Sequence, residues 1–473
     1  MRSSRGRYAM LALATLSVVG IALTQQGLGS LGPALMVEFN LDRMHLGFAF
    51  GMATLGSALL VLPAGLAVDA WGERRLMLLS GLVMGTALIA ATLVHAYWWL
   101  LLCLGIAGLG PAASWPAGVR AIYVWFERDR AAALGVRQTG NPLGGAIGAL
   151  LLPVFAIAGG YRAAFLCAGT ICIVATLIAA TFYHEPPGSS PARRTLGEML
   201  AAMRGLLTDT RVRLVTVTGM LLSVTQYISV AFLAVTLIAL AHLSVREAGF
   251  ALSVGLVGSC FGRLGWGYIS DRCFNGDRLL PMVFLAIITA ITSLAVSCVT
   301  AHTPLIAELS LAFILGSSAL GWNGLFAAAL VEIGGVQLSG SALGIASTGV
   351  FFTGIVVTPL FGRIVDVHGF PVAWMILAGV SMLSIWPALC ARNALRQGIR
   401  TLKFTVPKVN QGAVLGVYRT LGWDDVLPFT GTPGFSHRAK ILLDDFSLSP
   451  ILGSAKSSIA PLKGSASSHP KVR

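Results

Sequence analysis

The chain has few charged residues and, over most of its length, no lysine. Charged residues make up 11% of its 473 residues, against about a quarter in a soluble domain. Residues 1–390 contain 21 arginines and no lysine. With so little charge, most of the surface cannot meet water, which excludes an ordinary soluble globular protein.

Sequence patterns of the common catalytic and metal sites are also missing. The chain has no G-x-x-x-x-G-K-[ST] phosphate loop, no H-E-x-x-H motif and no His/Cys cluster with metal-ligand spacing. Its seven cysteines form no C-x-x-C pair and lie mostly in apolar runs, as packing residues do. We expect no enzyme, no cofactor, no metal and no use of ATP as the energy source.

Long apolar runs dominate the sequence instead. Hydrophobic residues make up 56% of the chain. A run of about 20 apolar residues crosses a hydrocarbon core roughly 30 Å thick, and lipid forces it to be helical. The sequence therefore predicts an all-α membrane protein with twelve transmembrane helices, although hydrophobic length alone also allows eleven or thirteen. They are expected at 9–35, 46–68, 76–95, 98–119, 132–157, 163–183, 213–241, 248–270, 279–300, 304–330, 341–362 and 372–390.

The longest polar break separates six of these spans from the other six. We expect an N-terminal six-helix bundle over residues 1–183, a central cytoplasmic loop over 184–212 and a C-terminal six-helix bundle over 213–392. Residues 393–473 are rich in Ser, Pro and Gly and hold all six lysines, which predicts a mostly disordered cytoplasmic tail. The alternative is a tail without function.

Arginines indicate how the spans are oriented, because cytoplasmic loops of membrane proteins are enriched in basic residues. With the N-terminus inside, the cytoplasmic segments before the tail hold sixteen arginines and the outer loops hold four. Both termini are therefore expected in the cytoplasm of a bacterium, with the chain crossing its inner membrane. The net charge of +14 divides between these arginines and the tail, so no nucleic-acid partner is expected.

Two short patterns recur in both halves. Gly65-Leu-Ala-Val-Asp69 is echoed by Gly267-Tyr-Ile-Ser-Asp271 at an offset of 202 residues. The segment 160–165 is echoed by 369–374 at an offset of 209 residues. Similar offsets at equivalent places predict a repeat, as in many secondary transporters.

The first of these patterns continues as Gly65-Leu-Ala-Val-Asp69-Ala-Trp-Gly72-Glu-Arg74-Arg75. It resembles the signature G-x-x-x-D-x-x-G-[RK]-[RK] of the major facilitator superfamily (MFS), with Glu73 at a commonly basic position. The resemblance implies a conformational switch, which breaks and forms contacts as the carrier changes state. Its residues would be Gly65, Asp69, Gly72, Arg74 and Arg75, with Gly267, Asp271 and Arg272 in the second half. The alternative for the arginines is that they only anchor the topology.

Residues 108–165 are similar to the helix-four-to-six region of bacterial MFS carriers, including many for organic anions. Gly108-Leu-Gly-Pro and Gly140-Asn-Pro142-Leu-Gly144-Gly145 carry this likeness. Many members place an arginine where this chain has Leu104, so proton coupling by that residue is not expected. The resemblance covers residues 9–392 and does not define a subfamily.

Two arginines lie inside spans, where a charge is costly and points to function. Arg137 is in span five, and Arg263 is in span eight. The resemblance places both near the inner mouth of one cavity, and Arg263 is similar in position to the substrate arginine of monocarboxylate carriers. Those carriers often have an aspartate where this chain has Ser259. The alternatives are snorkelling to lipid headgroups or a contact that gates the cavity.

Amides and aromatics in other spans complete the set of candidate substrate contacts. Spans one, four, seven and ten line the cavity in this superfamily. The candidates are Gln25, Gln26, Gln138, Gln226, Tyr227, Trp322 and Asn323. The alternative for each amide is a hydrogen bond to a neighbouring helix and no contact with a substrate. Glu308 is the one acid that hydropathy places clearly within a span, where it would carry a coupled proton or simply face the outer vestibule.

The sequence thus predicts a secondary transporter that works by alternating access. Its substrate would be a small organic anion, in particular a carboxylate, moved with a coupled proton or a counter-anion by a monomer in the lipid bilayer. Two alternatives remain: proton-coupled efflux of lipophilic drugs or metabolites, and a membrane sensor that transports nothing.

Overall fold

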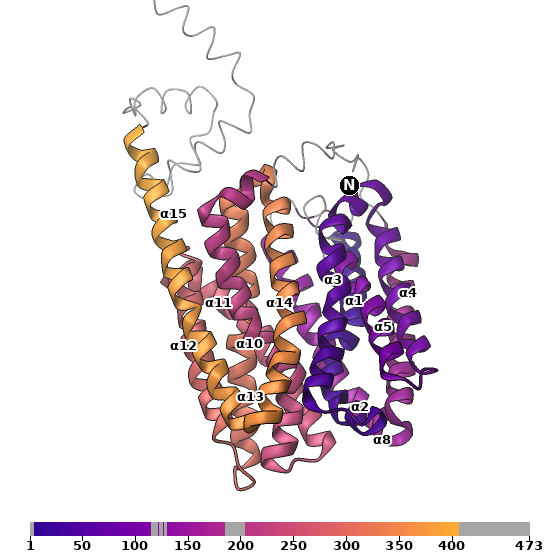
Figure 1. Cartoon of the computed structure of the whole chain (residues 1–473). Coiled ribbons are helices and arrows are strands. Elements are labelled where there is room, and N and C mark those ends of the chain that lie inside the picture. Colours follow the sequence, from indigo (N-terminus) through magenta and orange to yellow (C-terminus); the bar gives the residue numbers. More distant parts are fainter. Residues whose placement is uncertain (1–3, 115–121, 123–125, 127–129, 185–203, 406–473) are drawn as a thin grey trace, which may run out of the picture. The chain divides into compact units, whose positions relative to one another are not determined.

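The computed structural model describes residues 4–114, 122, 126, 130–184 and 204–405. Every regular element within these residues is a helix, which confirms the expected all-α class. Residues 1–398 form one compact unit, shown in Figure 1, and most of the expected tail lies outside the described residues.

The first half of this unit begins with a crossing built from three consecutive helices. They are α1 (Ser4–Gly27), the 3₁₀ turn η1 (Leu28–Leu31) and α2 (Gly32–Phe39). The other helices are α3 (Arg43–Trp71), α4 (Glu73–Ala91), α5 (Tyr97–Ala107), α6 (Leu109–Ser114) and α8 (Arg130–Phe182). α8 is two crossings joined at Gly159 and Gly160, where the backbone leaves the helix and Gly160 has φ of 69°.

Further long helices of the second half lie within the described residues. They are α10 (Thr210–Ala241), α11 (Val245–Cys273), α12 (Leu279–Ser297), α13 (Leu305–Ala319), α14 (Asn323–Leu383) and α15 (Ile385–Thr405). As a single rod, the 61 residues of α14 would extend about 90 Å, far more than one crossing needs. Gly369, with φ of 81°, is one point where this backbone turns.

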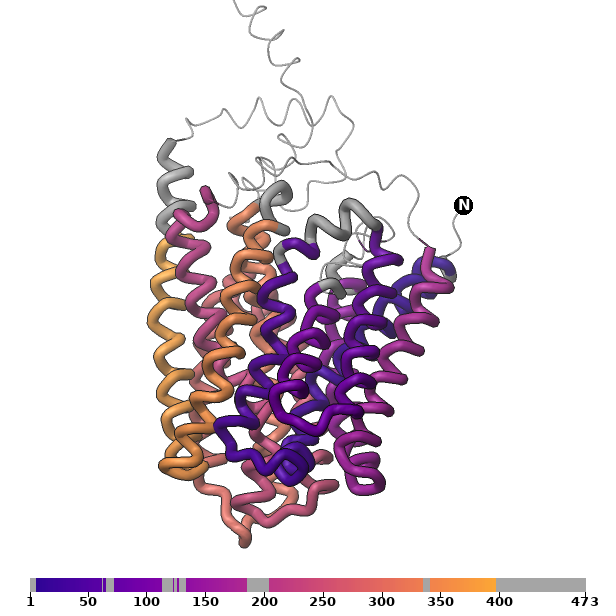
Figure 2. Tube along the Cα trace, turned by 45° about the vertical axis from the view of Figure 1, so that its right-hand side comes forward, coloured from indigo at the N-terminus to yellow at the C-terminus, as the bar shows by residue number. Residues whose placement is uncertain are grey.

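The described residues contain nine apolar helices long enough to cross a membrane. Two of them, Ala133–Phe182 and Ser341–Arg396, are long enough for two crossings each, and the shorter Tyr97–Ala112 adds one, which brings the count to twelve. Figures 1 and 2 show the first half (indigo to purple) packed beside the second (pink to orange). The expected two six-helix bundles are confirmed.

The repeat detected in the sequence marks the same turn in both bundles. Gly160 and Gly369 both have positive φ, which favours glycine because a Cβ is strained there. Five residues later, Phe165 and Trp374 are both fully buried. The repeated pattern therefore marks the turn at which the last crossing of each bundle begins and the aromatic residue that packs this crossing into the core.

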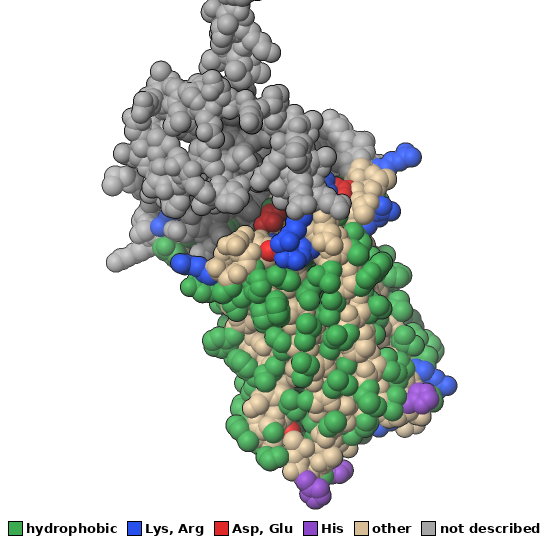
Figure 3. Space-filling view, turned by 90° about the vertical axis from the view of Figure 1, so that its left-hand side faces the viewer, with side chains coloured by type: hydrophobic (Ala, Val, Ile, Leu, Met, Phe, Trp, Pro, Cys, Tyr) green, Lys and Arg blue, Asp and Glu red, His purple; other side chains and the backbone are tan. Residues whose placement is uncertain are grey.

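The outer surface of the unit is apolar between two polar ends. Large hydrophobic side chains such as Phe261, Ile306 and Trp386 are more than 60% exposed. Figure 3 shows hydrophobic side chains covering the middle of one face, with arginines and acids gathered near one end and histidines at the other. This is the surface of a protein that meets lipid along its middle.

Asp277, in the turn between α11 and α12, connects that turn to α15. Its carboxylate accepts a hydrogen bond from Nε of Arg392 at 2.6 Å and is contacted by the backbone N–H groups of Leu279 and Leu280. Burial alone would raise the pKa of Asp277, but these hydrogen bonds outweigh it and hold the pKa below its usual value of 3.8.

Because the pKa of Asp277 is lower in the folded protein, its contribution to stability is complete above the unfolded pKa and is lost as the pH falls through the folded pKa. We expect Arg392→Gln to cost about 1 kcal/mol near neutral pH and to flatten the fall in melting temperature between about pH 5 and pH 3. Thermal unfolding in detergent measures both effects. The exposed Arg246→Gln is the control, and an unchanged acid profile in Arg392→Gln would contradict the assignment.

Candidate functional site

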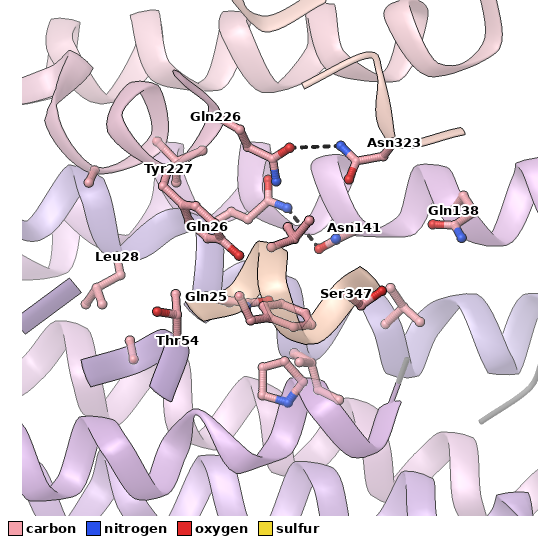
Figure 4. A pocket seen from close by; sticks show the side chains of 18 of the residues that line it. Gln25, Gln26, Leu28, Thr54, Gln138, Asn141, Gln226, Tyr227, Asn323 and Ser347 are labelled. Atoms are coloured by element: carbon pink, nitrogen blue, oxygen red, sulfur yellow. Dashed lines mark hydrogen bonds between the residues drawn. The ribbon is translucent and has the colours of Figure 1, made fainter. Parts of the chain in front are cut away.

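A cavity of about 140 Å³ lies between the two bundles. The first bundle contributes residues of α1, η1, α3, α6 and α8, and the second contributes residues of α10, α11 and α14 together with Trp322. Figure 4 shows polar side chains from both bundles pointing into this space. The cavity is thus positioned where a rocking motion of one bundle against the other would act on its contents.

All nine residues that the sequence proposed as substrate contacts line this cavity. They are Gln25, Gln26, Arg137, Gln138, Gln226, Tyr227, Arg263, Trp322 and Asn323. Three residues that are not among the sequence candidates also line it: Thr54, Asn141 and Ser347. Asn141 is an amide in the Gly140-Asn-Pro142 pattern of a span, so the sequence could have indicated it as a substrate contact. Thr54 and Ser347 are short side chains in apolar runs, and nothing in the sequence distinguishes them.

Two amide pairs line the cavity, one from each bundle. Nε2 of Gln26 donates to Oδ1 of Asn141 at 3.0 Å within the first bundle. Nδ2 of Asn323 donates to Oε1 of Gln226 at 2.9 Å within the second (Figure 4). Oε1 of Gln26 is buried without a hydrogen-bond partner among the described residues, so the first pair retains an acceptor for a ligand.

Arg137 is 4% exposed and lies close to an acid. The charge of Glu73 acts on its guanidinium, as does the nearby Tyr183, whose hydroxyl donates to Oε2 of Glu73 at 2.6 Å. The buried Glu73 belongs to the first turn of α4, within a crossing. The expectation that Glu308 is the one acid inside a span is therefore wrong, because α4 begins three residues earlier than hydropathy indicated.

Arg263 is 9% exposed and has a different environment. Its NH1 group donates to the backbone carbonyl of Gln138 at 3.2 Å, and its Nε has no acceptor among the described residues. No ion pair within the described part of the chain involves Arg263. It thus presents a buried charge to the cavity with hydrogen-bonding capacity left over.

Glu308 lies in the first turn of α13 and not at an exposed vestibule. Its side chain is only 2% exposed, and its Oε2 has no hydrogen-bond partner in the described structure. Glu308 does not line the cavity at the two amide pairs. Simple exposure, the alternative for this residue, is therefore wrong.

The first switch motif lies around the turn from α3 to α4. Gly72 has φ of 82° and precedes α4, Arg74 donates through Nε to the carbonyl of Ala180 at 2.5 Å, and Arg75 is exposed. The side chains of residues 65–71, with Gly65 and Asp69, lie outside the described residues. Arg74 thus contacts the end of the sixth crossing.

The second switch motif ends α11. Asp271 accepts from NH1 of Arg278 at 2.6 Å, and Nε of Arg278 donates to Glu332 of α14 at 3.0 Å. Arg272 lies over the Tyr268 ring at 5.6 Å. Among the described residues a Cβ at Gly267 would meet nothing within 4 Å, so Gly267 takes part in no close helix contact there.

At the end of the unit where α2 meets α3, the two bundles are in direct contact. Asp366 of α14 accepts from the backbone N–H groups of Arg43 and Met44 at 3.2 and 2.9 Å, which caps α3 from the opposite bundle. Gly362 brings the α14 backbone against α3, because a Cβ there would lie 2.0 Å from the carbonyl oxygen of Arg43. Asp366 and Gly362 thus join α3 of the first bundle to α14 of the second at this end of the unit.

Several known proteins are similar to this chain in sequence. An uncharacterized MFS-type transporter of Mycobacterium tuberculosis is 29% identical over 75% of this chain and 80% of its own length. The fujikurins efflux protein of Gibberella fujikuroi is 24% identical over 67% and 65% of the two chains. The hexuronate transporter of Escherichia coli K12 is 25% identical over 39% and 44%.

The fold agrees with a solved transporter structure. A point mutant of the nucleoside transporter NupG superposes with a TM-score of 0.66 at 15% identity, covering 81% of this chain and 99% of that one. The family model of the Major Facilitator Superfamily matches residues 14–350. With twelve crossings in two bundles around a central cavity, the chain is a secondary transporter of small solutes and belongs to the Major Facilitator Superfamily.

Proposed function

We propose that the transported solute is a small organic anion and that its carboxylate binds Arg263. The observation that carries this proposal is a guanidinium nine-tenths buried at the cavity, without a carboxylate partner among the described residues. Such a group is costly in a membrane unless it serves function. Arginine binds a carboxylate through two parallel hydrogen bonds and stays charged at any physiological pH.

The remainder of the cavity suits a polar solute of modest size. Amides on both sides, Gln26 with Asn141 and Gln226 with Asn323, supply donors and acceptors for hydroxyl groups. A volume of about 140 Å³ is below the 300–1,000 Å³ range of pockets for drug-sized ligands. This size favours the anion over lipophilic efflux. Among the relatives, the hexuronate transporter fits an anion and the fujikurins efflux protein fits the alternative, so the proposal rests on the cavity itself.

Arg137 has a secondary role in this proposal. Because Glu73 already offsets its charge, Arg137 attracts an anion less strongly than Arg263 does. We assign Arg137 and Gln138 to the wall of the site, with Gln25, Tyr227 and Trp322 closing it around the solute. The partly apolar rings exclude water from the charged contact.

Glu308 is the proposed carrier of a coupled proton. It is buried, lacks a hydrogen-bond partner for Oε2 in the described structure, and is near the charge of Glu247. The arginine distribution supports a bacterial inner-membrane location with both termini in the cytoplasm. The proposed protein is a monomer. Its proposed parts are an N-terminal bundle, a central loop, a C-terminal bundle and a tail, at residues 1–183, 184–212, 213–392 and 393–473.

Uptake by proteoliposomes tests the proposal. We expect radiolabelled glucuronate or a small monocarboxylate to accumulate when a proton gradient is imposed, and unlabelled carboxylates to compete. Uncharged sugars of the same size are the matched controls, because they fill the cavity without engaging Arg263. Transport of hydrophobic cations with no effect of carboxylates would instead establish efflux, and carboxylate binding without flux would establish a sensor.

A further inference from the structure

Two prolines inside the fifth crossing free backbone carbonyl groups. In a helix the N–H of each residue bonds the carbonyl four residues earlier, and proline has no N–H. Pro142 and Pro153 both lie inside α8. The carbonyls of Gln138 and Ala149 therefore lose their helical donors and are available to other groups.

The carbonyl of Gln138 has found its partner in the other bundle. NH1 of Arg263 in α11 donates to it at 3.2 Å. One turn earlier in α11, Sγ of Cys260 lies 3.9 Å from the carbonyl oxygen of Thr139. Both are side-chain contacts between the bundles, and the residues of the first, Arg263 and Gln138, line the cavity.

The carbonyl of Ala149 faces the same helix but meets no such side-chain donor within the described part of the chain. A Cβ on Gly249 would lie 2.6 Å from this oxygen, so the α11 backbone itself lies against it. The two prolines thus provide a natural comparison. Both free a carbonyl toward α11, and only the one freed by Pro142 bonds a charged side chain that, among the described residues, also lines the cavity.

We propose that the Pro142-freed carbonyl of Gln138 is the resting partner of Arg263, and that an entering anion replaces it. This inference rests on the proposed function and adds the step that links binding to movement. A carboxylate offers two charged acceptors, and charge-assisted hydrogen bonds are about twice as strong as neutral ones. The exchange removes a polar bond between the bundles only when solute is present.

Such an exchange gives the solute a different affinity for the joined and the separated arrangements of α8 and α11, as any ligand-driven change of state requires. It also explains how Arg263 is kept in place without an acidic partner in the described structure. The neutral carbonyl satisfies one donor at a site where a carboxylate side chain would compete with the solute for the whole guanidinium.

Alkylation of the native Cys260 in the full chain reports on this contact. Without any ligand, we expect Pro142→Ala to raise the rate of N-ethylmaleimide addition at Cys260 by about threefold or more, as read by peptide mass spectrometry. The substitution restores a backbone N–H, which competes with Arg263 for the Gln138 carbonyl and so weakens the contact between α8 and α11 beside Cys260. Pro153→Ala, the matched control, should leave the rate unchanged. Labelling of the exposed Cys298 corrects for reagent and fold.

Adding glucuronate separates the two proposals. In the wild type it should raise Cys260 labelling toward the level of Pro142→Ala, and Pro142→Ala should bind it roughly threefold to tenfold more tightly by thermal shift, since the competing acceptor is weakened. If glucuronate has no effect on the wild type, the anion site is wrong. The labelling rates without ligand then still show whether the hydrogen bond between Arg263 and the Gln138 carbonyl joins the bundles. Equal ligand-free labelling in wild type, Pro142→Ala and Pro153→Ala overturns the inference.

Discussion

Replacement of Arg263 with alanine should reduce carboxylate uptake by roughly 100-fold or more, the usual effect of removing one partner of a buried charge pair. The side chain supplies the one cavity charge that lacks an acid beside it in the described structure. Initial uptake rates in proteoliposomes measure the loss. Thermal unfolding should show that the variant still folds, because the substitution removes a charge that is costly to bury.

Two further variants make that result specific. Arg263→Lys keeps a positive charge but loses the fork of donors that binds a carboxylate, so an intermediate rate is expected. Arg246→Ala removes an exposed arginine from the same helix and should transport normally. Wild-type uptake by Arg263→Ala would refute the anion site, and so would full activity of Arg263→Lys together with loss in Arg246→Ala.

The second large effect is expected at Gly362. In Gly362→Val the new Cβ would lie 2.0 Å from the carbonyl oxygen of Arg43, where backbone on both sides leaves no room. The α3–α14 contact, including the Asp366 cap, then cannot close. We expect flux to fall roughly tenfold or more, in line with overpacking costs of about 1–3 kcal/mol, while solute binding measured by thermal shift persists.

Gly379→Val is the control for that experiment. It makes the same substitution later in α14, where a Cβ would meet no atom of the described residues within 4 Å. Its uptake should match the wild type. Equal flux in both valine variants would show that transport does not require this contact to close, and loss of binding together with flux in Gly362→Val would indicate a folding defect.

The parts of the fold that sequence reasoning predicted are those that depend on hydrophobic length and on backbone geometry. The apolar runs were visible because lipid forces each of them to be a helix, and the repeated motifs divided them into six and six. The paired glycines 160 and 369 were visible because positive φ restricts the residue type. Buried polar residues in apolar runs also stand out, which is why the nine proposed site residues converge on one cavity.

The parts that sequence reasoning missed depend on distant contacts. Glu73 looked like a loop residue because its neighbours are polar, and its contacts with Tyr183 and Arg137, distant in the sequence, show why it is buried. Asp366 reads as an ordinary acid near a helix end, yet its partners Arg43 and Met44 belong to the other bundle. The pairing of Gln226 with Asn323 was equally unpredictable, since the sequence around an amide does not indicate which group it will hydrogen-bond.

The paired turns at Gly160 and Gly369 also bear on how the protein is made. After the first turn, Tyr161 donates to the carbonyl of Val94 at 2.8 Å, and after the second, Trp374 donates to Thr236 at 3.0 Å. Each bond joins residues of the same half. Because domains made first tend to fold first during synthesis, the N-terminal bundle can complete its own packing while the C-terminal half is still on the ribosome.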